Sequence, residues 1–406
     1  MSGDNLYKNL IPVAPLKLAA LKGCTSLAEK VNAHLVKIRK ERLVNSNVFF
    51  LSEGYAQDTY LTNNETVRFG SGEGKGIIKE SVRGTDIFVI VDITNHSMRY
   101  TVSGNENRMS PDDHYQDLKR IVSAALPWAT RVNVIMPFLY GGRQDKRINL
   151  ESLDCAVALQ ELVSMGVSNI ITFDAHDPRI VNAIPLAGFD NFTPPFQFIK
   201  ALLLNDIKLK LDSEHLMIVT PDEGGMDRAV YYANVLGVNM GMFYKKYEHS
   251  IHETGENAYA EFTFLGDSIE GKDVIVVDDM IDTGKSLLEV CKELKLRKAN
   301  RIFICVTFGL FTKGLNAFDE YYENGLIDYI ILTNLSYHSE ELCSRPYFIE
   351  ADMSLYLATI IDCLNHDMSI GNVIVPTDRI HALVTEYNKK TKEEVETLNS
   401  TKGVTN

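Results

Sequence analysis

The chain is short of cysteine, of tryptophan and of long apolar runs, and each shortage argues against a class of protein. Its 406 residues include six cysteines and one tryptophan. No two cysteines form a Cys-x-x-Cys pair, so we expect reduced thiols and a cytoplasmic protein. We find no signal peptide and no apolar run of about 18 residues, so we expect neither secretion nor membrane insertion.

Positive charge is also scarce in this sequence. The 54 acidic residues outnumber the 41 lysines and arginines, which gives a formal net charge of −13. This balance argues against a nucleic acid or an anionic membrane as a partner. An anionic substrate would need local clusters of cations or a bound metal ion, so any clustered arginines and lysines are informative. The length predicts two domains rather than one.

The stretch from Val274 to Ser286 carries the strongest chemical signal. It reads Val-Ile-Val-Val-Asp-Asp-Met-Ile-Asp-Thr-Gly-Lys-Ser and leads into an apolar helical pattern. Four branched apolar residues in succession predict a strand buried on both faces, as in a parallel sheet. Ligands of open α/β sheets bind beyond the carboxyl ends of strands, so we expect Asp278 and Asp279 to face a pocket.

The turn after these acids suits a phosphate group. Gly284 can adopt a positive φ, and the amides of residues 283–286 would converge beside the N-terminus of the predicted helix. The two acids repel phosphate, so sugar hydroxyls or a metal ion are their natural partners. The segment therefore suits both ends of a ribose 5-phosphate. Segments of this kind also occur in α/β proteins without a ligand, and this one is not a Walker A loop.

Other predicted strands lead into polar loops. Strand 132–136 precedes three cations in five residues, Arg143 to Arg147, which suit a polyphosphate clamp in an acidic chain. A charge run of this kind is more commonly a solvated loop. Strand 169–173 precedes His176, which is flanked by carboxylates, so a metal or phosphate role and a plain surface role are about equally favoured. The glycine-rich stretch 68–76 predicts an irregular loop.

Five segments stand out for their polar and glycine-rich patterns. They are Phe69-x-Ser71-Gly-Glu73, Pro137-Phe138 through Lys146, Asp174-Ala-His176, Pro221-Asp222-x-Gly-Gly225, and the 274–286 stretch. Together they resemble the motifs of ribose-phosphate diphosphokinases, also called phosphoribosyl pyrophosphate synthetases. They follow the family's order over residues 18 to about 365, whereas a phosphoribosyltransferase would explain only the last motif.

The resemblance implies an α/β fold of two similar type I phosphoribosyltransferase-like domains, each a mainly parallel sheet flanked by helices. The expected limits are 1–183 for a domain with ATP-binding loops, 184–380 for a domain with the ribose 5-phosphate loop, and 381–406 for a charged tail. The implied reaction transfers the diphosphoryl group of ATP to the anomeric hydroxyl of ribose 5-phosphate with Mg²⁺. We expect a homo-oligomer, a dimer or a multiple of dimers, because the family's adenine loop acts across a subunit contact.

The resemblance also assigns roles to residues. ATP is expected to contact Phe69, Ser71, Glu73, Arg143, Gln144, Asp145 and Lys146. Ribose 5-phosphate is expected to contact Asp278, Asp279, Asp282, Thr283, Gly284, Lys285 and Ser286. Mg²⁺ is expected at His176 and Asp222, and the catalytic residues are expected to be His176 and Lys245, the latter on a mobile loop or hairpin.

The sequence departs from the family's pattern in several places. Ser71 replaces an acid, Phe308 replaces the histidine of a Thr-His-Gly motif, and Tyr247 stands where active members have an arginine. Residues 43–64 and 94–111 look like insertions. A non-catalytic, nucleotide-binding regulatory relative and a phosphoribosyltransferase therefore remain alternatives.

Overall fold

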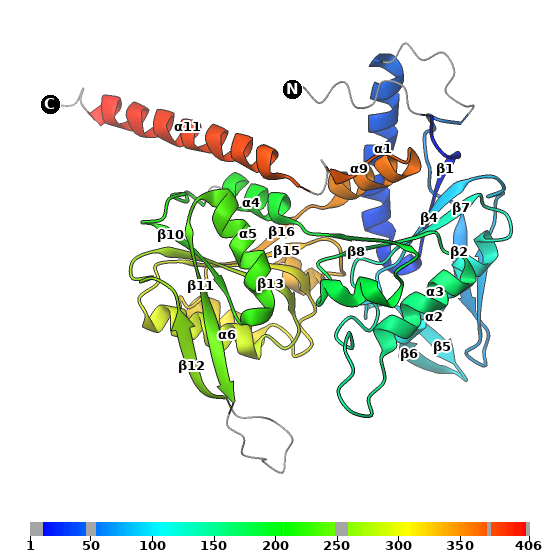
Figure 1. Cartoon of the computed structure of the whole chain (residues 1–406), viewed down its shortest axis with the longest axis horizontal. Coiled ribbons are helices and arrows are strands. Elements are labelled where there is room, and N and C mark those ends of the chain that lie inside the picture. The colour runs from blue at the N-terminus through cyan, green and yellow to red at the C-terminus, as the bar shows by residue number, and fades with distance from the viewer. Residues whose placement is uncertain (1–10, 46–53, 206, 248–258, 372–374, 403–406) are drawn as a thin grey trace. The chain divides into compact units, whose positions relative to one another are not determined.

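The computed structural model describes residues 11–45, 54–205, 207–247, 259–371 and 375–402, and it contains two compact units (Figure 1). The first unit comprises Met1–Thr193, Asn334–Tyr337 and Asp352–Val375, and the second comprises Pro194–Thr333, His338–Ala351 and Pro376–Asn406. The predicted domain limits of 1–183, 184–380 and 381–406 stay a prediction. The compact units have one feature that these limits do not include: two late segments of the chain belong to the first unit. Within the described ranges, no helix has both the length and the apolar character needed to cross a membrane.

The first unit is built on a wholly parallel sheet with the strand order β1-β4-β7-β8-β9. The order follows the chain, so the carboxyl ends of β4, β7 and β8 lie side by side at one edge. The predicted strands 132–136 and 169–173 correspond to β7 and β8, whereas β1 and β9 were not predicted. The bounds are β1 (Leu16–Ala20), β4 (Asp86–Ile90), β7 (Arg131–Ile135), β8 (Asn169–Phe173) and β9 (Gly188–Phe192).

The helices of the first unit begin and end at recognisable signals. A capping box formed by Ser110 and Asp113 starts α2, with Pro111 in its first turn. Gly166, with φ of 108°, ends α3. The bounds are η2 (Lys22–Cys24), α1 (Thr25–Asn45), α2 (Pro111–Ala125), α3 (Asp154–Met165), η3 (Pro178–Ala183) and α9 (Ser354–Asn365).

Two small hairpins complete this unit: β2 (Asn64–Arg68) with β3 (Gly74–Ile78), and β5 (Arg99–Val102) with β6 (Asn105–Arg108). The glycine-rich stretch is only partly a loop, because Gly74 and Gly76 lie in β3. A Cβ at these positions would come within 2.4 and 2.8 Å of Arg120 on α2, so glycine permits the close packing of strand on helix. The second hairpin lies within residues 94–111, one of the two apparent insertions.

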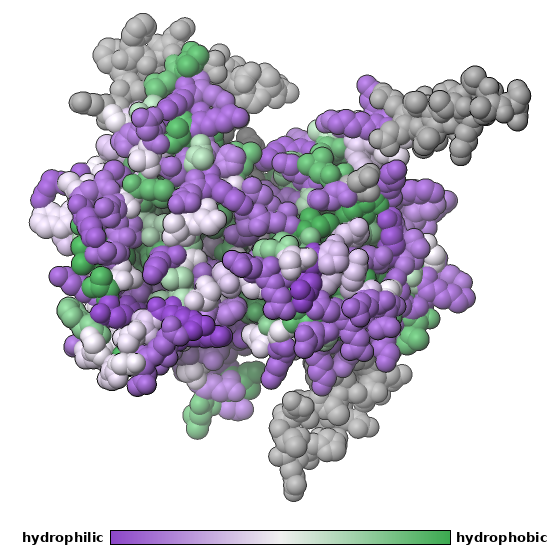
Figure 2. Space-filling view, turned by 180° about the vertical axis from the view of Figure 1, so that it is seen from behind, coloured by the Kyte–Doolittle hydropathy of each residue, from purple (hydrophilic) through white to green (hydrophobic). Residues whose placement is uncertain are grey.

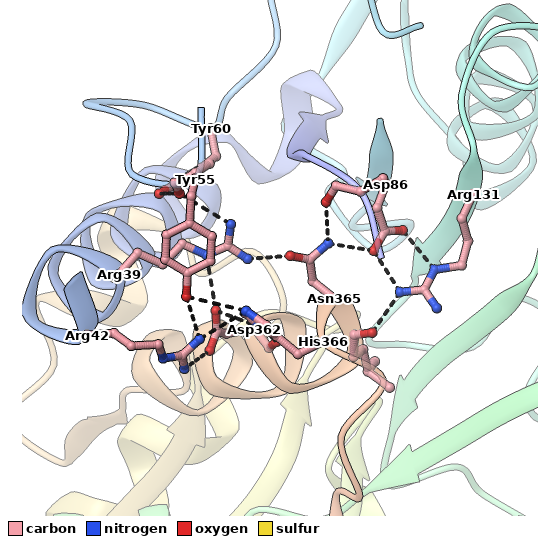
Figure 3. A network of polar contacts seen from close by, with 11 residues as sticks. Arg39, Arg42, Tyr55, Tyr60, Asp86, Arg131, Asp362, Asn365 and His366 are labelled. Atoms are coloured by element: carbon pink, nitrogen blue, oxygen red, sulfur yellow. Dashed lines mark hydrogen bonds and ion pairs between the residues drawn. The ribbon is translucent and has the colours of Figure 1, made fainter. Parts of the chain in front are cut away.

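A buried polar network holds the second of the two late segments, Asp352–Val375, in the first unit (Figure 3). Arg39 of α1 is fully buried and donates from Nε to the Asp362 carboxylate of α9 at 3.1 Å. Asn365, also on α9, donates to Asp86 Oδ2 at the start of β4 at 2.8 Å. Arg131 of β7 donates to the same Asp86 carboxylate at 2.7 and 2.9 Å. The network thus joins an early helix, two central strands and a late helix.

The second unit contains a sheet with the order β12-β11-β10-β13-β14-β15-β16, in which only the β11–β12 pair is antiparallel. The strand order reverses between β10 and β13, because β11 lies on one side of β10 and β13 on the other. Ligands of open α/β sheets bind at such a reversal. The strands are β10 (Leu216–Thr220), β11 (Asn239–Tyr247), β12 (Tyr259–Leu265), β13 (Asp273–Ile281), β14 (Ile302–Gly309), β15 (Tyr329–Thr333) and β16 (Phe348–Ala351).

Apolar clusters cover both faces of this second sheet. Ile275 and Val277 of β13 belong to one cluster, and Val274 and Val276 to the other, so the predicted burial on both faces is confirmed. The helices of the unit are α4 (Pro195–Leu204), η4 (Glu223–Gly225), α5 (Met226–Leu236), α6 (Lys285–Leu296), α7 (Asn316–Glu323), α8 (Glu340–Cys343) and α11 (Thr377–Lys402). The predicted α/β class, with mainly parallel sheets flanked by helices, is likewise confirmed. On the face shown in Figure 2, hydrophobic residues form small patches among hydrophilic ones.

Candidate functional site

Asp278 and Asp279 lie in the second half of β13, whereas the sequence predicts them just beyond the end of the strand. Consecutive side chains of a strand point to opposite faces of its sheet, so Asp278 and Asp279 have different surroundings. Asp279 is 6% exposed, whereas the Asp278 side chain is 24% exposed and lies 3.9 Å from Arg228 Nη1 of α5. Burial and the charge of Asp279 raise the pKa of Asp278, against the opposing effect of Arg228. A cationic ligand would therefore be favoured here.

The turn between β13 and α6 is three residues long and tightly held. Asp282 Oδ1 accepts a hydrogen bond from Thr312 Oγ1 at 2.6 Å. Gly284 has a φ of 79°, and a Cβ there would lie 2.2 Å from the Phe318 ring. Both the positive φ and the close approach of the ring require glycine, so the predicted role of Gly284 in the turn is confirmed.

The N-terminus of α6 offers donors to an anion. Helix α6 begins at Lys285, and its N-cap Gly284 has no side chain that could accept from the first-turn amides. The Lys285 amide donates to Thr283 Oγ1 at 3.4 Å. Ser286 Oγ is buried and has no hydrogen-bond partner among the described residues. A phosphate group bound here would accept from the amides and from this hydroxyl.

Asp222 follows β10, on the other side of the strand-order reversal. Its Oδ1 accepts from the Gly224 amide at 3.1 Å, and Thr220 Oγ1 donates to its carbonyl at 3.0 Å. A Cβ at Gly225 would lie 2.1 Å from Thr220 Oγ1, which explains the second glycine of the Pro-Asp-x-Gly-Gly motif. The charge of Asp222 contributes to the raised pKa of Asp278, so the two carboxylates interact electrostatically.

In the first unit, the loop after β7 is anchored at its start. The Tyr140 hydroxyl donates to Asp112 Oδ1 at 2.7 Å, and its ring stacks on Tyr115 with 4.4 Å between ring centres. Gly141 has a φ of 66°, and a Cβ there would lie 2.8 Å from the Cys155 amide nitrogen. The loop is therefore fixed against α2 and α3 before it reaches the predicted clamp.

The clamp residues themselves are mainly exposed. The side chains of Arg143, Gln144 and Lys146 face solvent, whereas Asp145 is half-buried. Asp145 Oδ2 is buried and has no hydrogen-bond partner within the described part of the chain. Three exposed donor side chains on an anchored loop suit a polyphosphate.

His176 follows β8 through a turn that leaves the sheet. Asp174 has a φ of 46°, and its amide donates to the Phe192 carbonyl at 2.7 Å. His176 is exposed. Arg179, through its hydrogen bonds, lowers the pKa of the neighbouring Asp177 to about 2, and Lys146 also lowers it. The loops after β7 and β8 therefore interact electrostatically at one edge of the sheet.

The turn between β2 and β3, residues 69–73, presents an aromatic ring beside an acid. Phe69 is 54% exposed, and its amide donates to the Glu73 carbonyl at 2.8 Å. Ser71 Oγ donates to Glu73 Oε2 at 2.9 Å. An exposed ring with adjacent hydroxyl and carboxylate groups can stack on a base and hydrogen-bond its edge.

The loop expected to carry a catalytic lysine is a β-hairpin where it is described. Lys245 pairs with Phe262, and Lys246 with Glu261, in the antiparallel ladder of β11 and β12. Residues 248–258 lie outside the described part, as do the side chains of Lys245 to Tyr247. Phe308, which replaces the histidine of the family's motif, is buried in β14 opposite Met280.

Our sequence reasoning missed two residues that support these groups. Tyr140 anchors the clamp loop, and the tyrosine of the Pro137-Phe-x-Tyr140 segment was the available signal. Arg228 lies beside Asp278, but nothing in the sequence around α5 marks it, because the contact depends on how α5 packs beside β13.

Comparisons with known proteins agree with this arrangement. Residues 16–166 match the N-terminal domain of ribose phosphate pyrophosphokinase, and residues 194–322 match the phosphoribosyl transferase domain. Ribose-phosphate pyrophosphokinase of Shewanella oneidensis is 30% identical over 308 residues, which is 75% of this chain and 88% of that protein. The enzyme of Vibrio cholerae is 28% identical over 328 residues, 79% of this chain and 94% of that protein.

A solved structure shares the fold. Phosphoribosylpyrophosphate synthetase from Mycobacterium smegmatis superimposes with a TM-score of 0.67 at 20% identity, covering 87% of this chain and 99% of that one. The two matching domains, the coverage of the relatives and the shared fold lead to one conclusion. The chain belongs to the ribose-phosphate pyrophosphokinase family.

Proposed function

We propose that this protein is a Mg²⁺-dependent ribose-phosphate diphosphokinase, which makes phosphoribosyl pyrophosphate and AMP from ATP and ribose 5-phosphate. One observation carries the proposal. The strand-order reversal of the second sheet has carboxylates on both sides, Asp222 after β10 and Asp278 on β13, and the 282–286 turn follows at the same edge. This combination suits a sugar that bears both hydroxyl groups and a phosphate.

In the proposed reaction, the anomeric oxygen of ribose 5-phosphate forms a bond to the β-phosphorus of ATP. The bond from that phosphorus to the oxygen bridging the α-phosphate breaks, and AMP leaves with the electron pair. The proton of the anomeric hydroxyl passes to water. Such transfers require the protein mainly to position the substrates and to stabilise negative charge.

The second unit would bind the sugar. The first-turn amides of α6, with the side chains of Thr283, Lys285 and Ser286, would hold the 5-phosphate. Asp282 would keep the turn in shape through its bond with Thr312. Asp278 would accept hydrogen bonds from the ribose hydroxyls, because it has access to solvent and Asp279 is nearly buried.

The first unit would bind ATP. Arg143, Gln144 and Lys146 would contact the triphosphate, and Asp145 would orient the clamp. Phe69, Ser71 and Glu73 would contact the adenine. Lys245 would donate to the phosphoryl oxygens as negative charge develops during transfer.

The acids of the second unit fit a magnesium ion. Mg²⁺ prefers oxygen ligands and is commonly bound by one or two carboxylates together with water and substrate phosphates. Asp222 and Asp278 supply such oxygens. Burial and the neighbouring carboxylates Asp279 and Asp222 raise the pKa of Asp278, and a cation would neutralise the charge of these carboxylates. His176 of the first unit would hold Mg²⁺ through water. When bound, Mg²⁺ would neutralise the negative charge of the phosphate groups during transfer.

The fit does not rest on a ready-made cluster of ligands. Within the described residues, the group of acids and histidine with metal-ligand spacing is Asp212, Glu214 and His215. It precedes β10, at the opposite end of the strand from Asp222. Substrate phosphates would therefore supply part of the coordination, which is the usual manner of Mg²⁺ binding in phosphoryl transfer.

The test is release of AMP from ATP in the presence of Mg²⁺ and ribose 5-phosphate, with each component omitted in turn. The proposed enzyme releases AMP only when all three are present. A regulatory relative would bind ATP and release none. A phosphoribosyltransferase would release none either, but would consume phosphoribosyl pyrophosphate when given a nitrogenous base.

A further inference from the structure

The β5–β6 hairpin lies against the 69–73 turn. Its own two-residue turn has positive φ at both positions, 49° at Ser103 and 81° at Gly104, as in type I′ hairpins. The Ser103 amide donates to the Gly70 carbonyl at 2.8 Å. A Cβ at Gly72 would lie 3.1 Å from Cγ2 of Val102, so the two turns are also packed side by side.

A second contact joins the hairpin to the base of the same turn. The Arg68 guanidinium, immediately before Phe69, lies over the Tyr100 ring at 5.1 Å from its centre. Arg68 Nη1 also donates to Asp117 Oδ1 of α2 at 2.6 Å. The Tyr100 hydroxyl donates to Asp113 Oδ1 in the first turn of α2 at 3.2 Å. Tyr100 therefore links the 69–73 turn to a helix whose start is capped.

The two faces of β5 have different surroundings. Tyr100 and Val102 are half-buried and point toward the turn and α2, whereas Arg99 and Thr101 are exposed. Arg99 forms an ion pair with Glu106 across the hairpin, away from these contacts. One face of the strand therefore contacts the rest of the unit. Substitutions on the other, exposed face can serve as controls for substitutions on the first.

We propose that the β5–β6 hairpin positions the 69–73 turn, and that Tyr100 and Val102 are positioning residues for binding of the adenine ring of ATP. The inference rests on the proposed function, in which Phe69, Ser71 and Glu73 contact that base. The turn contains Gly70 and Gly72, whose backbone freedom is large. A turn that samples several conformations binds its ligand more weakly, in proportion to the fraction in the competent conformation. The hairpin raises that fraction.

Steady-state kinetics of AMP release with the full-length protein tests this role. Tyr100→Ala removes the ring from Arg68 and the hydroxyl from Asp113, so KM for ATP should rise about three- to thirtyfold. KM for ribose 5-phosphate and kcat should stay within about twofold, because the residue contacts neither the sugar loop nor the reacting groups. Tyr100→Phe keeps the ring over Arg68 and should restore most of the affinity for ATP.

A second variant removes the hairpin altogether. The Met109 amide donates to the Met98 carbonyl at 2.9 Å, so the two ends of the hairpin are neighbours. Residues 99–108 can be replaced by Asn-Gly, which forms a two-residue turn. This variant should raise KM for ATP at least as much as Tyr100→Ala. Arg99→Ala, on the exposed face of β5, is the matched control and should leave all constants unchanged.

Two results would overturn the inference. One is an unchanged KM for ATP in both Tyr100→Ala and the hairpin deletion. The other is a parallel loss in kcat and in both KM values, which would indicate a general structural role. If the unaltered protein releases no AMP, the proposed function fails, and calorimetric titration with ATP then decides the hairpin's role. Weaker ATP binding by Tyr100→Ala than by Arg99→Ala supports it, and equal affinity or no ATP binding by the unaltered protein overturns it.

Discussion

Arg39 of α1 and Asp362 of α9 form a buried ion pair across 323 positions of the sequence. Asp362 also accepts a hydrogen bond from Arg42, one turn further along α1 (Figure 3). These contacts place α9 within the first unit, although the chain has by then built most of the second. The first unit is therefore complete only after nearly the whole chain is present.

This relationship predicts a large loss of stability in Asp362→Ala. The change leaves the Arg39 guanidinium buried without its carboxylate partner, and breaking a buried pair in this way costs about 3–5 kcal/mol. Trp128 is the chain's sole tryptophan and belongs to the first unit, so its fluorescence during denaturant unfolding reports on that unit. Glu41→Ala is the control, because Glu41 pairs with Lys37 on the exposed side of the same helix. An equal shift of the unfolding midpoint in Asp362→Ala and Glu41→Ala would contradict the stabilising role of the network.

The sugar site yields a second prediction, for Asp278→Asn. The variant loses a charged acceptor for the ribose hydroxyls, which costs about 1.5–3 kcal/mol, or roughly ten- to a hundredfold. We expect the loss in kcat/KM for ribose 5-phosphate, with ATP affinity nearly unchanged. Glu214→Gln, at an exposed acid outside the strand-order reversal, should change neither substrate's constants. A collapse of ATP affinity without any change for the sugar would show that the acid is misassigned.

The sequence predicted much of the second unit because its signals are local. The run from Val274 to Val277 can be buried on both faces only in a central strand, and the acids after it mark the ligand edge. The turn at Gly284 was likewise predictable, since its positive φ favours glycine. The reversal of strand order was not predictable in this way, because it depends on which strands pair.

Other parts of the fold had weaker signals. Strand β9, Gly-Phe-Asp-Asn-Phe, lacks an apolar run, and Asp190 within it accepts a hydrogen bond from Asn169 of β8. The β5–β6 hairpin has only two inward-facing side chains, so its alternation was hidden among polar residues. The contact between Arg39 and Asp362 has no local signal at all. Long-range pairing decided these features, and the sequence pattern records only local preferences.

The 69–73 turn predicts weak discrimination between nucleotides. Ser71 can both donate and accept, whereas an aspartate would accept from the adenine amino group and repel the guanine carbonyl. Ser71→Asp should therefore raise the preference for ATP over GTP about tenfold, as measured by the ratio of kcat/KM values. Ser71→Ala is the control, because it removes the hydroxyl without adding a charge and should not raise the preference. Strict ATP selectivity in the unaltered protein would rule out this explanation.

The β11–β12 hairpin predicts unequal roles for two adjacent lysines. Lys245 and Lys246 are consecutive in β11, and consecutive positions of a strand belong to opposite faces of its sheet. A donor that acts on the transition state is worth about 2.7–4 kcal/mol, so Lys245→Ala should lower kcat roughly a hundred- to a thousandfold with little change in either KM. Lys246→Ala serves as the matched control. A larger effect of Lys246→Ala would reverse the assignment.

In the proposed reaction, two phosphoryl groups move together from ATP to the sugar. It is tested most directly by incubating the protein and Mg²⁺ with ribose 5-phosphate and ATP labelled separately at its α, β or γ phosphorus. We expect the α label in AMP, and the β and γ labels in the sugar product in equal amounts. Transfer of the γ label alone with release of ADP, or retention of all three labels in ATP, would contradict it.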